Sequence, residues 1–192
     1  MEQSSIEVFY PQNTMAFRNW LQEHHVSKQA VWIVFHKKAS KKESLSWSEA
    51  VDVALCFGWI DSKKIKINDD TSHQFFSKRK AKSTWSKINK EKIDRLIAEG
   101  LMTDAGYKSI EIAKENGSWT ILDSVEELII PADLEEAFNI HEGAKDYFLS
   151  LSKSSKKMLL HWVVLAKLPL TRQKRIDEIA LHAGKQQKPK NF

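Results

Sequence analysis

The 192-residue sequence predicts an α+β fold, in which a small sheet of about three strands packs with helices and is followed by a C-terminal helical module. β-Favouring segments occur between residues 31 and 77, whereas the apolar residues that follow recur at helical spacing. Seven tryptophans can anchor a substantial core, since each large aromatic side chain buries about 150–250 Å².

The first predicted helix covers residues 14–24, where three apolar side chains share one helix face: Phe17, Trp20 and Leu21. Asn13 or Thr14 is its expected N-cap. Residues 31–35 (VWIVF) predict a strand, because all five side chains favour β structure. Both faces of this strand are apolar, so we expect it to be buried on both sides.

The segment at residues 46–62 (SWSEAVDVALCFGWIDS) contains a predicted helix that begins after Ser46 and ends at Gly58. Ser46 and Glu49 have the spacing of a capping box, and Gly58 is a typical C-terminal stop. Most of the positions between them are apolar, apart from a narrow polar stripe that includes Asp52. We therefore expect this helix to have a wide buried surface.

Two further strands are expected at residues 59–67 and 72–77, and the polar turn between them predicts a hairpin. The remaining helices are expected at residues 86–99, 103–116, 133–140, 142–150, 154–167 and 171–183. Residues 118–131 have the composition of an extended connector. The predicted domains are an α+β domain over residues 1–120, a helical module over residues 131–185 packed on it, and a disordered basic tail over residues 186–192.

The net charge of +5 divides into blocks of opposite sign. Residues 36–95 carry a net charge of +7 and residues 153–192 carry +8, whereas residues 96–152 between them carry −9. In one interpretation these blocks are solvated faces that partly neutralise one another. In the other, a basic block binds an anionic partner such as nucleic acid, phosphate or a phospholipid surface.

Cysteine usage and hydropathy indicate the compartment. Cys56 is the single cysteine, which excludes an internal disulfide and fits a reducing environment. The N-terminal residues lack a secretory signal pattern, and no run reaches the roughly 18 apolar residues of a membrane-spanning helix. We expect a cytoplasmic protein without a membrane span. Nothing in the sequence predicts its oligomeric state.

Several chemistries are disfavoured by the motifs. The sequence contains no G-x-G-x-x-G, G-x-x-x-x-G-K-[ST], G-x-S-x-G or H-E-x-x-H pattern, and its seven histidines are scattered. We therefore expect no cofactor and no metal site. Cys56 follows Asp52 by four residues, near the end of a predicted helix, where the carboxylate and the helix dipole both raise a thiol pKa. This position indicates a structural cysteine rather than a nucleophile.

One resemblance covers residues 10–185. The run LSWSEAVDVALCFGWIDS, followed by FFSKRKAKSTWSKIN, resembles the YdeI/OmpD-associated family, whose members are also called bacteriocin-protection proteins. The segments WVVLAK and TRQKRI resemble the small helical C-terminal module of that family. The resemblance implies a role in stress or bacteriocin protection, exerted by binding. It implies no reaction, cofactor or catalytic residue.

The candidate site lies just beyond the end of the central helix. Arg79 follows the return strand of the hairpin and is expected across from Asp61, while the next helix begins after Ser86 and its free N–H groups favour an anion. The predicted anion-capable pocket comprises Lys37, Asp61, Arg79, Trp85, Ser86 and Asn89. The alternative is a buried Asp61–Arg79 pair beside an ordinary N-cap at Ser86.

The tryptophans also allow two interpretations. Trp47, Trp59 and Trp85 form either a surface on which bases stack or a set of core anchors. Three functions therefore stay open: a protection protein that acts by binding, a nucleic-acid-binding module, and an enzyme that acts on a small anionic substrate. The sequence does not decide whether the protein is an enzyme.

Overall fold

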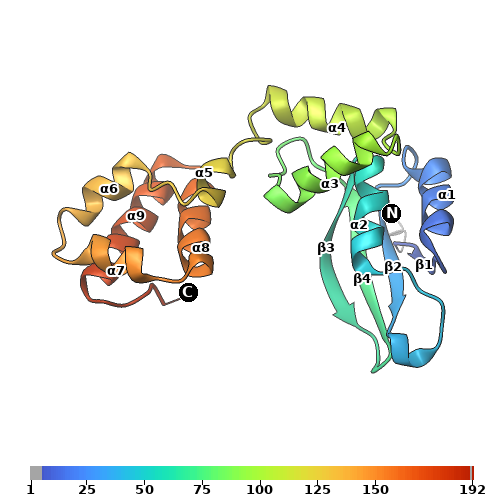
Figure 1. Ribbon diagram of the computed structural model, residues 1–192, viewed down its shortest axis with the longest axis horizontal. Coiled ribbons are helices and arrows are strands. Elements are labelled where there is room, and N and C mark those ends of the chain that lie inside the picture. Colours follow the sequence, from blue (N-terminus) through green and yellow to red (C-terminus); the bar gives the residue numbers. More distant parts are fainter. Residues whose placement is uncertain (1–5, 191) are drawn as a thin grey trace, which may run out of the picture. The chain divides into compact units, whose positions relative to one another are not determined.

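The computed structural model describes residues 6–190 and 192, and the chain divides between Trp119 and Thr120 into two compact units (Figure 1). Each unit has its own hydrophobic core. The α+β class is confirmed, because the first unit contains a sheet and the second is helical. The elements of the first unit are β1 (Val8–Phe9), α1 (Thr14–His24), β2 (Ala30–His36), η1 (Lys38–Ser40), α2 (Trp47–Cys56), β3 (Trp59–Lys66), β4 (Thr71–Lys78), α3 (Lys87–Ala98) and α4 (Asp104–Glu115).

Within the described residues the sheet has four strands in the order β1-β2-β4-β3. The predicted hairpin is confirmed as the antiparallel pair β3–β4, and β4 also pairs antiparallel with β2. Strand β1 was not predicted, and it pairs parallel with β2. A strand of two residues has no periodicity to detect, and only the partner that tertiary folding supplies defines it.

Strand β2 is buried on one face and half-buried on the other. Val31, Ile33 and Phe35 are in the core with residues of α1 and α2, whereas Trp32 and Val34 keep part of their surface exposed. The expectation of burial on both faces is therefore wrong. We call the second face the outer face of the sheet; the register assigns to it Val8, Ala30, Trp32, Val34, His36, Ile60, Lys63, Ile65, Thr71, His73, Phe75 and Ser77.

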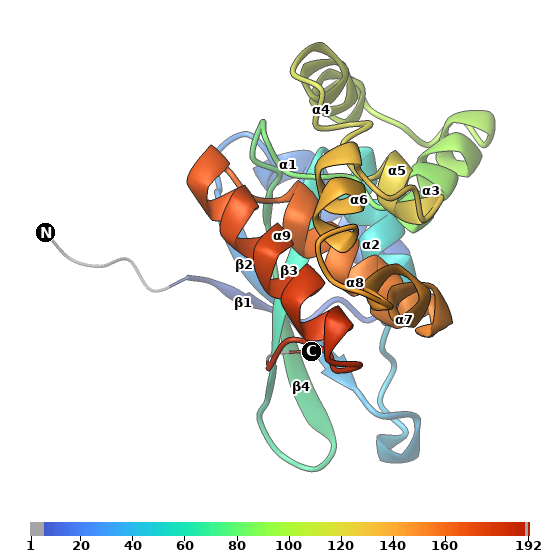
Figure 2. The same ribbon diagram turned by 90° about the vertical axis from the view of Figure 1, so that its left-hand side faces the viewer.

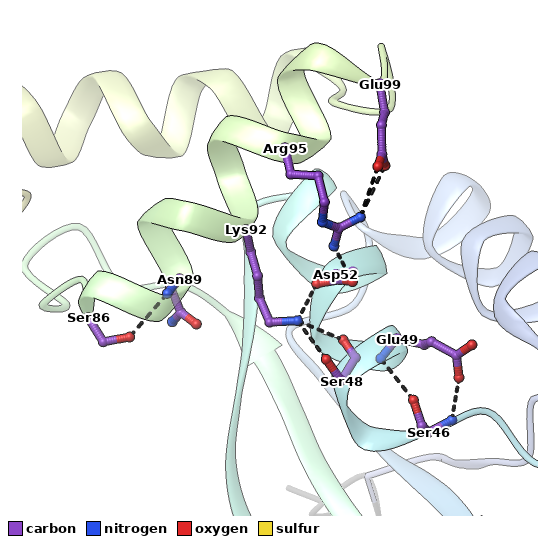
Figure 3. Close-up of polar contacts among 9 residues, drawn as sticks. All are labelled: Ser46, Ser48, Glu49, Asp52, Ser86, Asn89, Lys92, Arg95 and Glu99. Atoms are coloured by element: carbon purple, nitrogen blue, oxygen red, sulfur yellow. Dashed lines mark hydrogen bonds and ion pairs between the residues drawn. The ribbon is translucent and has the colours of Figure 1, made fainter.

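Helix α2 begins at the predicted capping box. The Ser46 hydroxyl accepts from the Glu49 N–H at 3.3 Å, and the Glu49 carboxylate accepts from the Ser46 N–H at 2.7 Å (Figure 3). The broad burial is confirmed for six side chains of the helix: Ala50, Val51, Val53, Ala54, Leu55 and Cys56. Gly58 follows with φ of +69°, in the left-handed region that ends a helix and admits glycine most readily.

A polar network joins α2 to α3. Asp52 accepts hydrogen bonds from Lys92 and Arg95, each at 2.5 Å, and Lys92 also donates to the Ser48 hydroxyl at 2.7 Å (Figure 3). The side chains of Asp52 and Lys92 are each less than one-fifth exposed. Basic side chains of α3 thus cover Asp52 in the polar stripe of α2 and pair its carboxylate.

Helix α4 approaches the end of α2 at Gly106. A Cβ atom at this glycine would lie 2.4 Å from the carbonyl oxygen of Cys56, which is a backbone atom and cannot rotate away. The same carbonyl accepts from the N–H of Thr103 at 3.1 Å and from its hydroxyl at 2.6 Å. These contacts hold the start of α4 against the C-terminal end of α2.

The second unit contains α5 (Asp123–Glu126), α6 (Ala132–Phe138), α7 (Ala144–Ser150), α8 (Lys153–Val164) and α9 (Pro169–Gly184). Helix α9 lies against α6, α7 and α8 (Figures 1 and 2). The expected extended connector is wrong, because α5 forms within it and buries Leu122 and Val125.

The basic residues of α9 are partly engaged within the second unit. Arg172 donates to both carboxylate oxygens of Asp133, at 2.6 and 2.9 Å, and these bonds lower the pKa of that carboxyl. The guanidinium of Arg175 lies 5.2 Å from the centre of the Trp162 ring. In the tail, for which disorder stays a prediction, the Phe192 ring lies 5.0 Å from that of Trp162; Asn191 is outside the described residues.

We expect Gly106→Ala to lower the free energy of unfolding by about 1–3 kcal/mol, because the added methyl group overpacks a backbone contact. The sign is diagnostic, since helix propensity alone would make alanine more stable by about 1 kcal/mol. Urea denaturation measures the change. Glu111→Ala, at an exposed position of the same helix, is the control and should differ from wild type by less than about 0.5 kcal/mol. Stabilisation by Gly106→Ala would contradict the close approach.

We expect Asp52→Asn to lower the free energy of unfolding by about 1–3 kcal/mol, because Lys92 and Arg95 lose a charged acceptor. Asp94→Asn, at an exposed position of α3, removes the same charge and should change stability by less than about 0.5 kcal/mol. Equal effects of the two substitutions would mean that charge in general, and not the α2–α3 network, is responsible.

Candidate functional site

The structure distributes the six predicted site residues over two hollows of the first unit and the start of a helix. Lys37 and Asp61 line the first hollow, which we call the hairpin cavity. It has a volume of about 580 Å³ and is lined by Phe35, His36, Lys37, Leu45, Ser46, Trp47, Asp61, Lys64, Ser72 and Gln74. The hairpin tip and the η1 loop meet beside it, where the Lys37 N–H donates to the Asp70 carbonyl at 2.9 Å (Figure 1).

Asp61 is engaged inside the hairpin cavity. Its Oδ2 atom accepts from the indole N–H of Trp47 at 2.8 Å and from the side-chain amide of Gln74 at 2.9 Å. Gln74 is buried on the central strand β4, so it anchors the carboxylate to the sheet. The carboxylate thus joins the start of α2 to β3 and β4.

Arg79 occupies the second hollow, which we call the Arg79 cavity. Its volume is about 510 Å³, and its lining comes from the ends of α1, α2 and β4 and from one face of α4: His25, Val26, Phe57, Gly58, Trp59, Lys78, Arg79, Lys80, Ala81, Ala105, Lys108, Ser109 and Ile112. These lining residues include four basic side chains and no Asp or Glu.

The Arg79 guanidinium packs against the face of an aromatic ring. Its central carbon lies 3.6 Å from the centre of the Trp85 ring, and Nη1 donates to the Thr84 carbonyl at 2.8 Å. Trp85 is 1% exposed and in turn lies 5.0 Å from the Trp119 ring, centre to centre. Stacking on a buried indole fixes the plane of the guanidinium and leaves its charge without a hydrogen-bonded carboxylate.

Two N–H donors at the Arg79 cavity have no partner within the described part of the chain. They are Arg79 Nε and the indole Nε1 of Trp59, and both atoms are buried. A buried donor without an acceptor costs roughly 1–3 kcal/mol. Burial also lowers the pKa of Arg79 to about 10, although the charge of Asp61 acts in the opposite direction. The site therefore holds desolvated positive charge and unused donors.

The last two predicted residues begin α3. The Ser86 hydroxyl accepts from the backbone N–H of Asn89 at 3.3 Å, which is the ordinary N-cap that the sequence allowed as an alternative (Figure 3). The structure brings neither residue into the lining of the two cavities. Of the six predicted residues, Arg79 is the one whose charge is buried, where it stacks on the ring of Trp85.

Trp59, Trp85 and Cys56 follow their structural interpretations, whereas Trp47 is not the core anchor that the second interpretation of the tryptophans proposed. Trp59 and Trp85 are each 1% exposed and belong to the core, whereas Trp47 is 54% exposed. Cys56 is buried, and its thiol pKa is raised as predicted, chiefly by burial, although Arg18 acts to lower it. Among the described residues, no three His, Cys, Asp or Glu side chains gather as a metal site would require.

Sequence reasoning missed most of the lining of the Arg79 cavity. Lys78 and Lys80 flank Arg79 directly, so the run KRK after the return strand is a signal that could have found them. Lys108 and Ser109 lie some thirty residues later on α4, and Trp59 reads as a core residue. Only the packing of α4 across the end of the sheet brings these residues to Arg79.

Two known families match the chain, one on each side of the boundary between the two compact units. Residues 9–109 match the family described as a domain of unknown function, DUF8412, and residues 127–185 match the family described as bacteriocin-protection, YdeI or OmpD-associated. The second match is shorter than the resemblance over residues 10–185 suggested, and it does not include the segment at residues 46–62. No curated protein and no solved structure matches the chain.

The first match spans the sheet except Val8, and every residue of the Arg79 cavity except Ile112. The second match spans α6 to α9. Within the described residues, no helix combines the length and the apolar composition that crossing a membrane requires. The chain therefore belongs to the DUF8412 family through its first unit, and its C-terminal helices match the model of the YdeI or OmpD-associated family.

Proposed function

We propose that the protein binds a small oxyanion, a phosphate or carboxylate group of a small molecule, in the Arg79 cavity. One observation carries the proposal: the Nε–H of a stacked, desolvated guanidinium and a buried indole N–H both lack an acceptor at a hollow whose lining has no carboxylate. An oxyanion would supply acceptors for both donors and a charge opposite to that of Arg79. Arginine is well suited to this role, because its planar donors match the geometry of carboxylate and phosphate groups.

The energetics favour a ligand over an empty hollow. Lys78, Lys80 and Lys108 add positive charge around Arg79, and like charges that are close together raise the free energy of the folded state. A hydrogen bond to a charged partner contributes about 1.5–3 kcal/mol. The volume of about 510 Å³ lies within the range of small-molecule sites, about 300–1,000 Å³.

The pKa of Arg79 gives the sign of its effect on folding. Because its pKa in the folded protein is about 10, below the ordinary value of an arginine, the folded state binds this proton more weakly than the unfolded chain does. Below pH 10 both states carry the proton, so the charge opposes folding throughout the physiological range. A bound oxyanion favours the charged form and so relieves this cost.

The family description supports a coarse role. The C-terminal module belongs to a family described by bacteriocin protection, and we propose that this chain acts in protection or stress response by binding its ligand in the cytoplasm. Binding of an anion fits the lining, since it supplies N–H donors and positive charge.

Titration calorimetry with inorganic phosphate at low ionic strength tests the proposal. We expect saturable binding by the wild type and affinity about 10–100-fold weaker in Arg79→Gln, which corresponds to one lost charged hydrogen bond. Lys108→Ala should weaken binding in the same direction without affecting folding, because this side chain is exposed on α4. The indole N–H resonance of Trp59, assigned by its loss in Trp59→Phe, should shift as phosphate is added.

Lys87→Ala is the matched control, since it removes the same charge from an exposed position of α3 outside the cavity. It should bind phosphate with an affinity close to that of the wild type. Absence of phosphate binding in the wild type would refute the proposal, and so would equal affinities in Arg79→Gln, Lys108→Ala and Lys87→Ala.

A further inference from the structure

The outer face of the sheet carries a second, chemically different feature. Trp32 and Phe75 are directly opposite each other on β2 and β4, the two inner strands of the sheet. Their ring centres are 4.9 Å apart and their planes are inclined by 70°. Both side chains remain partly exposed, although aromatic residues on inner strands ordinarily belong to the core. The rings therefore form an aromatic platform on an open face.

The charge around this platform has a single sign. The ammonium group of Lys63 lies 5.2 Å from the centre of the Trp32 ring and 5.4 Å from that of Phe75. The other outer-face positions of the described strands hold apolar residues, Ser, Thr and two histidines, and none of them holds Asp or Glu. An anionic polymer can thus cross this face without meeting a carboxylate of the strands.

We propose that the outer face of the sheet binds single-stranded nucleic acid, with bases stacked on Trp32 and Phe75 and a backbone phosphate paired with Lys63. A four-stranded sheet that presents aromatic rings on its inner strands is a known platform for unpaired bases. Charge complementarity selects this occupant, because the platform combines aromatic surface with an ammonium group and lacks acidic side chains. This site is separate from the Arg79 cavity, and its function does not depend on the proposed oxyanion.

The magnitudes favour exchange of Lys63 for a base. An exposed cation–π contact contributes about 0.5–1 kcal/mol, whereas a base stacked on an aromatic side chain contributes about 1–3 kcal/mol. Displacement of the Lys63 ammonium from the rings therefore costs less than stacking gains. The long side chain of Lys63 keeps its charge near the platform, where it can neutralise a phosphate.

Fluorescence anisotropy with labelled 12-nucleotide oligo-dT and oligo-U tests the inference on the full chain. We expect binding that strengthens as salt is lowered, and affinity at least about 10-fold weaker in Trp32→Leu and in Phe75→Leu, which keep an apolar side chain but remove the stacking ring. Circular dichroism verifies folding of each variant. If one of the two variants misfolds, the other still tests the role of the rings. Tighter binding of oligo-U would identify RNA, and tighter binding of oligo-dT would identify DNA.

Two lysines on one strand give a matched pair. Lys63→Ala should reduce the slope of log affinity against log salt by about 0.7, the value for one phosphate contact on a single strand. Lys64→Ala removes the same charge from the opposite face, where Lys64 is in register with buried Gln74, and should leave the slope unchanged.

Three results would overturn the inference. The first is no binding of either oligonucleotide at 25 mM salt. The second is equal loss of affinity in Lys63→Ala and Lys64→Ala with no effect of Trp32→Leu, which would indicate nonspecific charge attraction. The third is a wild-type dimer in sedimentation equilibrium that Trp32→Leu dissociates, because the outer face would then be occupied by a second copy of the chain.

Discussion

Burial of α2 is the constraint on which the first unit depends. A helix with six buried side chains in ten residues must be covered on several sides at once, and here α1, β3, α3 and α4 contact it. Its exposed stripe is too narrow for a surface helix, and even Asp52 is covered by Lys92 and Arg95. The order of the surrounding elements follows from this requirement, because each of them removes a different side of α2 from water.

The Arg79 cavity is a consequence of that arrangement. Gly58 ends α2 in a left-handed conformation and turns the chain into β3, while Gly106 lets α4 approach the same end of the helix. Arg79 follows the end of strand β4 and lies beside Gly58, whose carbonyl accepts from the backbone N–H of Arg79 at 2.9 Å. The guanidinium is thus desolvated by elements assembled for packing, and it stacks on Trp85 rather than pairing with Asp61. A buried charge without a bound carboxylate is unfavourable for folding alone, which is why we attribute it to ligand binding.

The two proposed sites use different physics. The Arg79 cavity is a hollow with fixed donors, and it suits a small anion whose oxygens replace lost water. The outer face is an aromatic platform with one mobile ammonium group, and it suits stacked bases linked by phosphates. Except for Ile112 of the cavity and Val8 of the outer face, both lie within the part of the chain that matches DUF8412, so the anionic partner suggested by the basic block at residues 36–95 has two chemically distinct candidate sites in one unit.

Local chemistry alone determined the helix starts at Asn13, Ser46 and Ser86, the hairpin and the α+β class, because capping, turn residues and side-chain periodicity act over a few neighbours. Of the candidate site, the sequence identified Arg79, Asp61 and Trp85 but placed them in one pocket. Tertiary structure decided that Asp61 bonds to Trp47 and Gln74, that Lys108 of α4 joins Arg79, and that Trp32 faces outward while Val31 faces inward. Sequence periodicity cannot distinguish two apolar faces of one strand. Helices α1 and α2 pack on the face that holds Val31, so Trp32 and Phe75 on the other face remain at the surface.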